Sequence, residues 1–184
     1  MSDVSGPKGI RRGRPPMRGS SKLGPRTPVE DPRPFEAPRG SHTQASADPL
    51  RAPGRRRVVL FVCIGNACRS QMAEAFAKAY GADVAEARSA GLSPAPIIAP
   101  LTRKVLADRN VTMDGQFPKG LETARERVDV LVNMSGLPLA VEATRILKWG
   151  VQDPIGHDEA TFRNVAAQIE DLVMRLILEL RAGA

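Results

Sequence analysis

The residues VVLFVCIGNACRSQMAEAF, at positions 58–76, decide how this chain is interpreted. They begin as a continuous apolar run rich in β-branched side chains, which predicts a strand buried on both faces over residues 58–62. A short loop that contains both of the chain's cysteines follows. Residues 70–80 then repeat apolar side chains at three and four spacing, which predicts a helix. The stretch therefore predicts a buried strand, a loop and a helix in direct succession.

The residues that follow alternate the same two patterns. Apolar runs predict further strands at 84–88, 128–134 and 145–151, and helical spacing predicts helices at 101–109, a short one opened by Gly136 and Pro138, and a long one at 158–181. Alternating strands and helices predict an α/β layer fold with a parallel sheet that is covered on both sides. Ligands bind beyond the carboxyl ends of the strands in such folds, and the loop at 63–69 lies at such an end.

The first third of the 184-residue chain has a different composition. Residues 1–57 contain 13 Lys and Arg against 5 Asp and Glu, and 10 of the 16 prolines. Because so polar a segment cannot bury enough apolar surface to offset its ordering entropy, we expect a disordered basic tail over 1–56 and a catalytic domain over 57–184. The arginine clusters at 11–14 and 55–57 suit contact with nucleic acid or an anionic surface, but a solvated tail is the interpretation we favour.

Three observations bear on location. No stretch approaches the roughly 18 apolar residues that span a bilayer. No apolar segment follows the basic N-terminus, which argues against a secretory signal and against a membrane partner. Two cysteines five positions apart do not form the disulfide framework of a small secreted protein. We therefore expect a cytoplasmic protein, and the sequence does not indicate an oligomeric state.

The loop between strand and helix carries the chemistry. Backbone N–H groups and the positive end of the following helix converge there, which suits an oxyanion such as phosphate. The predicted binding residues are Ile64, Gly65, Asn66, Ala67, Cys68 and Ser70. Arg69 adds a planar fork of donors, and the same field favours the thiolate of Cys63, the nucleophilic form. The alternative, two cysteines as small buried hydrophobes beside a surface arginine, does not explain the whole string.

Within the loop, each small residue has an expected task. Gly65 lets the backbone approach the ligand, and Asn66 tolerates unusual backbone angles while its side chain ties the loop. Ser70 either caps the helix or donates a hydrogen bond to the sulfur of Cys63. No metal or cofactor is expected.

The string C-I-G-N-A-C-R-S followed by Met72, Ala73 and Glu74 resembles the phosphate-binding loop of the low-molecular-weight protein tyrosine phosphatase family. The superfamily also includes phosphatase-like arsenate reductases. The resemblance covers about residues 57–181. It implies a three-layer fold, with a four-stranded parallel sheet, helices on both faces and the phosphate-binding loop after the first strand.

The same resemblance implies further site residues. The family carries its general acid on an Asp-Pro pair after the last strand, and Asp153 with Pro154 stands at that place; a turn residue or helix cap is the alternative. Ser89 matches a position that supports the loop. Cys68 either forms a reversible disulfide with Cys63 or is a passive small residue. Outside this set, His157 is expected in a solvated loop and Trp149 in the core or the pocket wall.

Two activities fit these residues. The favoured one is a cysteine-dependent phosphatase that hydrolyses phosphotyrosine or aryl phosphates through a phosphocysteine. The runner-up is an arsenate reductase or transferase that uses an external thiol such as mycothiol or glutathione, because Gln71 and the segment at 153–169 resemble the reductases and no cysteine follows Cys68. A third interpretation, an inactive phosphate-binding module whose tail contacts nucleic acid, does not account for the intact Cys63, Arg69 and Asp153.

Overall fold

The computed structural model describes residues 55–123 and 127–183. The tail predicted at 1–56 therefore lies outside the described residues, except for its last two. Among the described residues the elements are, in chain order, β1 Arg57–Cys63, α1 Arg69–Gly81, β2 Ala85–Gly91, α2 Pro100–Ala107, the 3-10 helix η2 Leu121–Thr123, β3 Val128–Asn133, β4 Ala143–Lys148 and α3 Glu159–Ala182. No helix in this part of the chain is long and apolar enough to cross a membrane.

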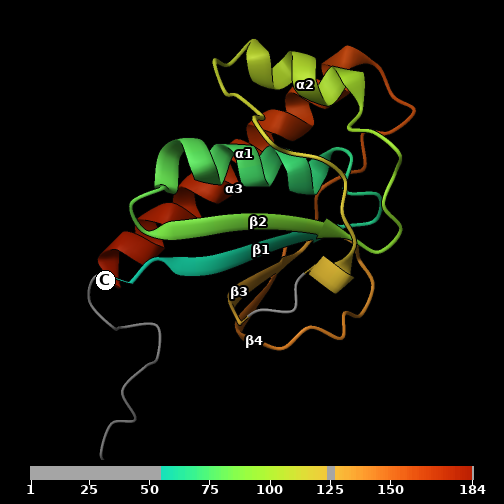
Figure 1. Ribbon diagram of the computed structural model, residues 1–184. Coiled ribbons are helices and arrows are strands. Elements are labelled where there is room, and N and C mark those ends of the chain that lie inside the picture. The colour runs from blue at the N-terminus through green and yellow to red at the C-terminus, as the bar shows by residue number, and fades with distance from the viewer. Residues whose placement is uncertain (1–54, 124–126, 184) are drawn as a thin grey trace, which may run out of the picture. The chain divides into compact units, whose positions relative to one another are not determined.

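The four strands form one sheet in the order β2-β1-β3-β4, and every neighbouring pair is parallel (Figure 1). Every residue of β1 is buried, as is every residue of β3, because both strands are central and both faces of the sheet are covered. The predicted α/β class, the four-stranded parallel sheet and the loop after its first strand are thereby confirmed.

The two faces of the sheet are covered differently. Val59, Phe61 and Val132 face a large core that all three α-helices share, and α1 packs closely against α3. An added Cβ at Gly81 would lie only 2.7 Å from Ile177, so this glycine permits the close helix contact. The other face, with Leu60 at its centre, is covered by η2 and by the segment at 134–142. Leu121 of η2 packs on this face, together with Leu139 and Val141 of the segment.

The short helix predicted from Gly136 and Pro138 does not form, and that prediction was wrong. Gly136 has φ +76, and the side chain of Asn133 holds the chain in a turn by accepting from Ser135 N (2.8 Å) and donating to Leu137 O (2.8 Å). These local bonds compete with helical ones, and Pro138 lacks a backbone donor. The second face therefore has loop where a helix was expected.

The last strand lies earlier than predicted. Expected at 145–151, β4 is Ala143–Lys148, because the chain leaves the sheet after Trp149 N donates to Asn133 O (3.0 Å). Residues 149–153 then run across the carboxyl ends of the strands. Because the strand ends at Lys148, the segment that follows it carries Asp153 to the loop after β1, where Asp153 contacts Arg69.

A buried carboxylate ties β1 to β3 at the opposite end of the sheet. Asp129 accepts hydrogen bonds from Val58 N (2.9 Å) and Arg55 Nη2 (2.6 Å), and Arg127 lies 3.2 Å away. Burial by itself would raise the pKa of this carboxyl group, but the hydrogen bonds and the nearby guanidinium groups outweigh burial and lower the pKa. Asp129 is therefore held in its charged form in the folded protein.

Candidate active site

The loop at 63–68 wraps around the N-terminus of α1, which begins at Arg69. Asn66 has φ +45, so the chain turns inward there through a left-handed conformation that asparagine tolerates. Within the described residues, the backbone N–H groups of residues 64–68 donate to no protein acceptor. Free N–H groups at the start of a helix form a cradle for an anion.

Cys63 is positioned at the bottom of this cradle. Its Sγ lies 3.0 Å from Ser70 Oγ, and the two side chains are buried. Asn66 Nδ2 donates to the same Ser70 oxygen at 2.7 Å, so the hydrogen of the hydroxyl group is free to point at the sulfur. The N-cap of α1 is Cys68, so Ser70 does not cap the helix, and of its two expected contacts the structure contains the one with the sulfur of Cys63.

Arg69 is buried and its donors are divided between protein and cradle. Nη1 donates to Met134 O (2.9 Å) and to Val151 O (3.2 Å), and Nη2 donates to the carboxylate of Asp153. Nε is buried without a partner among the described residues. A buried unpaired donor on a guanidinium group is costly unless a ligand satisfies it. Arg69 can therefore offer Nε and Nη2 to two oxygens of one anion.

Asp153 reaches the site from the loop after β4. Its side chain is 45% exposed and contacts Arg69, so the carboxylate stands between solvent and the cradle. Ile155 N donates to its other oxygen at 3.3 Å, and Pro154 is buried and anchors the loop. This placement suits a group that passes a proton to or from a ligand on Arg69.

Asn66 is the centre of a buried network behind the cradle. Its Nδ2 also donates to Ser89 Oγ (2.9 Å), and its Oδ1 accepts from Gln71 Nε2 (2.9 Å) and Lys119 N (2.8 Å). Ser89 therefore lies where a loop-supporting residue was expected. Its hydroxyl group donates in turn to the buried carboxylate of Glu74.

Sequence reasoning missed several members of this network. Glu74 appeared only as part of a motif, yet its carboxylate pairs with Lys78 (2.6 Å) and Lys119 (3.2 Å). Gln71 was singled out only for its resemblance to the reductases, and Lys119 was not singled out at all. The signal available for Glu74 was its place in the predicted helix, one turn after Ser70 and therefore close to the cysteine loop. Nothing in the sequence indicated Lys119, whose place depends on the pairing of Gly120 with Gly91.

A second loop, at 92–99, runs along the cradle and fixes its outer edge. Ser93 N donates to Ile64 O (2.9 Å), Ala95 N to Gly65 O (2.9 Å) and Ala99 N to Ala67 O (3.1 Å). An added Cβ at Gly65 would meet no protein atom within 3.8 Å, its nearest neighbours being 3.9 Å away. Protein packing therefore leaves Gly65 open, and its expected role toward a ligand stays a prediction.

Gly91, by contrast, is required by packing. A Cβ there would lie 2.8 Å from Asn66 N and from Ile64 O. No real Cβ sits so close to backbone atoms, so any side chain would displace the cradle. This was not foreseen from the sequence, in which the glycine lies just beyond the strand predicted at 84–88.

Cys68 and Cys63 are both buried and both free. Burial raises the pKa of the Cys68 thiol to about 11, although a hydrogen bond with Thr102 acts in the opposite direction. Cys68 is thus a protonated thiol at neutral pH, and the disulfide with Cys63 stays a prediction. Of the two further candidates, Trp149 packs its ring 5.8 Å from that of Phe61, and His157 is exposed.

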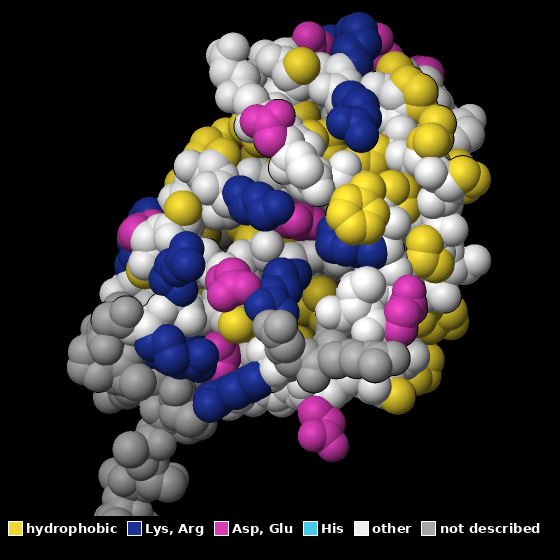
Figure 2. Space-filling model, viewed as in Figure 1, with side chains coloured by type: hydrophobic (Ala, Val, Ile, Leu, Met, Phe, Trp, Pro, Cys, Tyr) yellow, Lys and Arg dark blue, Asp and Glu magenta, His cyan; other side chains and the backbone are white. Residues whose placement is uncertain are grey.

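Exposed apolar side chains surround the mouth of the site. Ile97 (64% exposed) and Ile155 (55%) belong to the two loops that border it, and Phe117 (60%) precedes Lys119. Hydrophobic side chains also gather in Figure 2 along the margin that holds the loops beyond the strands' carboxyl ends. The rim of the cradle therefore combines an anion-binding centre with an apolar border.

Comparison with known proteins defines the class. A sequence profile for the family "Low molecular weight phosphotyrosine protein phosphatase" matches residues 58–183. The chain belongs to this family.

Individual relatives carry two kinds of name. A "Glutaredoxin arsenate reductase" from Synechocystis is 32% identical over 128 residues, which are 66% of this chain and 97% of the relative. A solved "arsenate reductase in the phosphate binding state" has a TM-score of 0.61 and 30% identity, and covers 67% of this chain and 98% of its own. A low molecular weight protein tyrosine phosphatase from T. tengcongensis has a TM-score of 0.57 and 27% identity, and covers 67% and 99%.

Proposed function

We propose that this protein reduces arsenate with the help of an external thiol. The observation that carries the proposal is the cradle itself, in which Cys63 lies below five N–H groups, and these groups and the buried Nε of Arg69 have no acceptor within residues 55–123 and 127–183. Arsenate has the charge and tetrahedral shape of phosphate, so the same donors would hold it. Relatives named arsenate reductases support this choice over the phosphatase activity that the sequence had favoured.

The first step joins arsenic to sulfur. The thiolate of Cys63 attacks arsenic, an S–As bond forms, and one As–O bond breaks. The leaving group is a hydroxyl group of arsenate, which departs as water after it takes one proton. We assign that proton to the carboxyl group of Asp153, which contacts Arg69. Arg69 and the N–H groups stabilise the charge on the remaining oxygens throughout. Arsenic is still pentavalent in this adduct.

The second step supplies electrons from outside the chain. A thiolate attacks the sulfur of Cys63, the S–As bond pair leaves with arsenic as arsenite, and a mixed disulfide remains. A second thiol then reduces this disulfide, so two thiols are oxidised for each arsenate reduced. The sequence contains two cysteines in all, and Cys68 is buried and protonated, so an internal relay lacks a ready second thiolate.

The test is arsenite formation with glutathione and mycothiol supplied separately. Cys63→Ser should lose all arsenite formation. Cys68→Ser is the matched control and should keep it, because the second thiol comes from solution. Absence of arsenite with either thiol, or an equal loss in both variants, would refute the proposal.

Phosphate monoester hydrolysis is the second candidate, favoured by one observation. Asp153 stands at the open side of the cradle beside an apolar rim, where a general acid would meet the leaving oxygen of an aryl ester. Asp153→Asn should then slow the hydrolysis of phenyl phosphate far more than that of para-nitrophenyl phosphate, whose leaving group needs no proton. Equal losses for the two esters would count against the acid.

A further inference from the structure

A groove lies on the second face of the sheet, between β4 and the segment at 134–142, where the predicted helix is absent. It has a volume of about 440 Å³ and is lined mainly by Leu131, Leu137, Pro138, Leu139 and Ile146. Leu137 (53% exposed) and Ile146 (54%) leave more than half of their surface open to solvent. The groove is therefore apolar, preformed and uncovered by the described residues.

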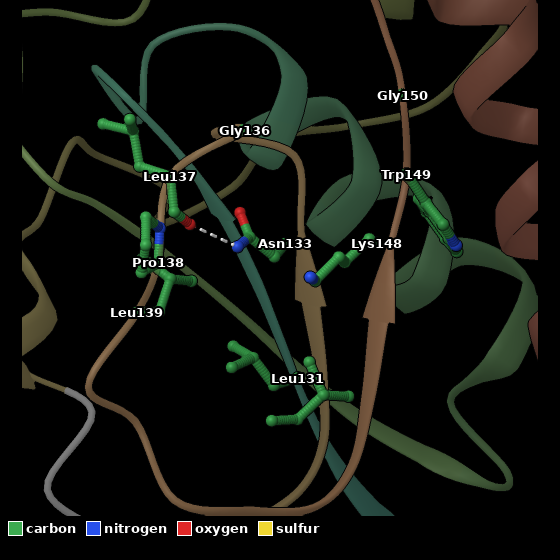
Figure 3. A pocket seen from close by; sticks show the side chains of 10 residues that line it. Leu131, Asn133, Gly136, Leu137, Pro138, Leu139, Lys148, Trp149 and Gly150 are labelled. Atoms are coloured by element: carbon green, nitrogen blue, oxygen red, sulfur yellow. Dashed lines mark hydrogen bonds between the residues drawn. The ribbon is translucent and has the colours of Figure 1, made fainter. Parts of the chain in front are cut away.

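Its polar groups gather at one end. Lys148 lines the groove at the carboxyl end of β4, and Figure 3 shows its Nζ pointing across toward Asn133. Among the described residues, no hydrogen bond or ion pair of Lys148 is found, whereas most other lysines of the domain have a carboxylate partner. An unpaired ammonium group over an apolar floor complements an anion that has an apolar body.

The wall of the groove is held in place by its own bonds. Asn133 donates to Leu137 O (Figure 3). It also accepts from Ser135 N and Oγ, so the amide is occupied in shaping the turn. Leu131 and Ile146 are directly paired across β3 and β4 and therefore form a common floor. The site is thus built on two strands and a braced turn, and its shape does not depend on a ligand.

We propose that this groove binds a small amphipathic anion, with its apolar body on Leu131 and Ile146 and its single carboxylate, or an equivalent group, on Lys148. The volume lies within the range of roughly 300–1,000 Å³ found for small-molecule sites. An apolar floor with one cation at its end favours a ligand that has both a negative charge and an apolar body of matching shape. The apolar part supplies most of the affinity, and the lysine orients the ligand.

The groove is separate from the oxyanion cradle but shares its supports. The segment after β3 also carries Met134 O, and the segment after β4 carries Val151 O, and these two carbonyls hold Arg69. A ligand in the groove would lie against the same two segments. Binding in the groove does not require Cys63, so its test is independent of the reaction proposed above.

The test uses the full chain and the fluorescent probe 8-anilinonaphthalene-1-sulfonate, which has an aromatic body and one sulfonate. We expect saturable fluorescence with one site per chain, and competition by decanoate but not by decyltrimethylammonium, which reverses the charge. Lys148→Gln should weaken probe binding roughly three- to fivefold, the scale of a partly exposed ion pair. Ile146→Glu should weaken it more than tenfold.

Leu178→Glu is the matched control. Leu178 is 58% exposed on α3, away from the groove, and the same substitution there should leave probe binding unchanged. Circular dichroism of each variant shows whether it is folded. Probe binding that survives both groove variants, or equal competition by the two decyl compounds, would overturn the proposal. Sedimentation that shows Ile146→Glu converting a dimer into a monomer would overturn it as well, because a second copy would then cover the groove.

Discussion

Asn66→Ala should be among the most destabilising single substitutions in the domain, because Asn66 both makes several buried hydrogen bonds and holds a left-handed backbone conformation. Its side chain is fully buried and makes four hydrogen bonds, to Ser70, Ser89, Gln71 and Lys119. At about 1 kcal/mol net for each bond, their loss costs about 4 kcal/mol if no water replaces them. Its φ of +45 adds about 1 kcal/mol when alanine must adopt it.

We therefore expect Asn66→Ala to lower the free energy of unfolding by about 3–5 kcal/mol, with water recovering part of the loss. Asn66→Gly separates the two contributions. Glycine adopts the left-handed conformation freely but is more flexible in the unfolded chain, so this variant should be about 0.5–1 kcal/mol more stable than the alanine variant. Both should also bind phosphate more weakly, since the cradle loses its brace.

Urea denaturation followed by circular dichroism measures these differences in the free energy of unfolding. Calorimetric titration with inorganic phosphate measures how tightly the cradle binds the anion. The exposed Asn164 on α3 offers the control Asn164→Ala, which should change stability by about 0.5 kcal/mol or less. If Asn66→Ala matched the unaltered protein in stability, the network would not hold the loop. If the glycine variant were less stable than the alanine variant, backbone conformation would not be part of the cost.

Three further predictions follow from individual groups. Asp153→Asn should tighten phosphate binding roughly two- to fivefold, because its carboxylate competes with the anion for Arg69; unchanged or weaker titration isotherms would contradict this. Iodoacetamide at pH 8 should alkylate Cys63 well before Cys68, whose pKa is about 11, as peptide mass mapping can show; equal rates would remove the argument from burial. The lowered pKa of Asp129 means that its stabilisation is present above about pH 4 and is lost as pH falls through the folded-state value, so Asp129→Asn should flatten the acid limb of a urea stability profile.

Local chemistry explains why some parts were predictable. The run at 58–62 is apolar at every position and rich in β-branched residues, which is typical of a strand buried on both faces, so its central place in the sheet was predictable. The loop residues are adjacent in the chain, so the nearness of Cys63, Arg69 and the helix start was predictable from the sequence. The apolar face of α3 was also predictable, because its spacing repeats over 24 residues.

Competing local bonds explain the main error. Gly136 and Pro138 are compatible with a helix start, but the side chain of Asn133 takes the hydrogen bonds that a helix would need. Which of the two wins depends on where β3 ends and on what covers its face. That is information about position in the sheet, and no window of sequence contains it.

Long-range pairing decided the rest of the site. Asp153 lies 84 residues from Arg69, and Lys119 lies 53 residues from Asn66, so their contacts exist only because parallel strands bring every carboxyl end to one edge. Glu74 and Gly91 likewise acquire their roles from neighbours that are distant in the chain. The sequence by itself determined the strand, the loop and the position of Cys63 and Arg69 beside the start of a helix, since these depend on adjacent residues. The tertiary structure alone decided what braces the loop, what faces Arg69 and which face of the sheet stays open, because those depend on how separate elements pack.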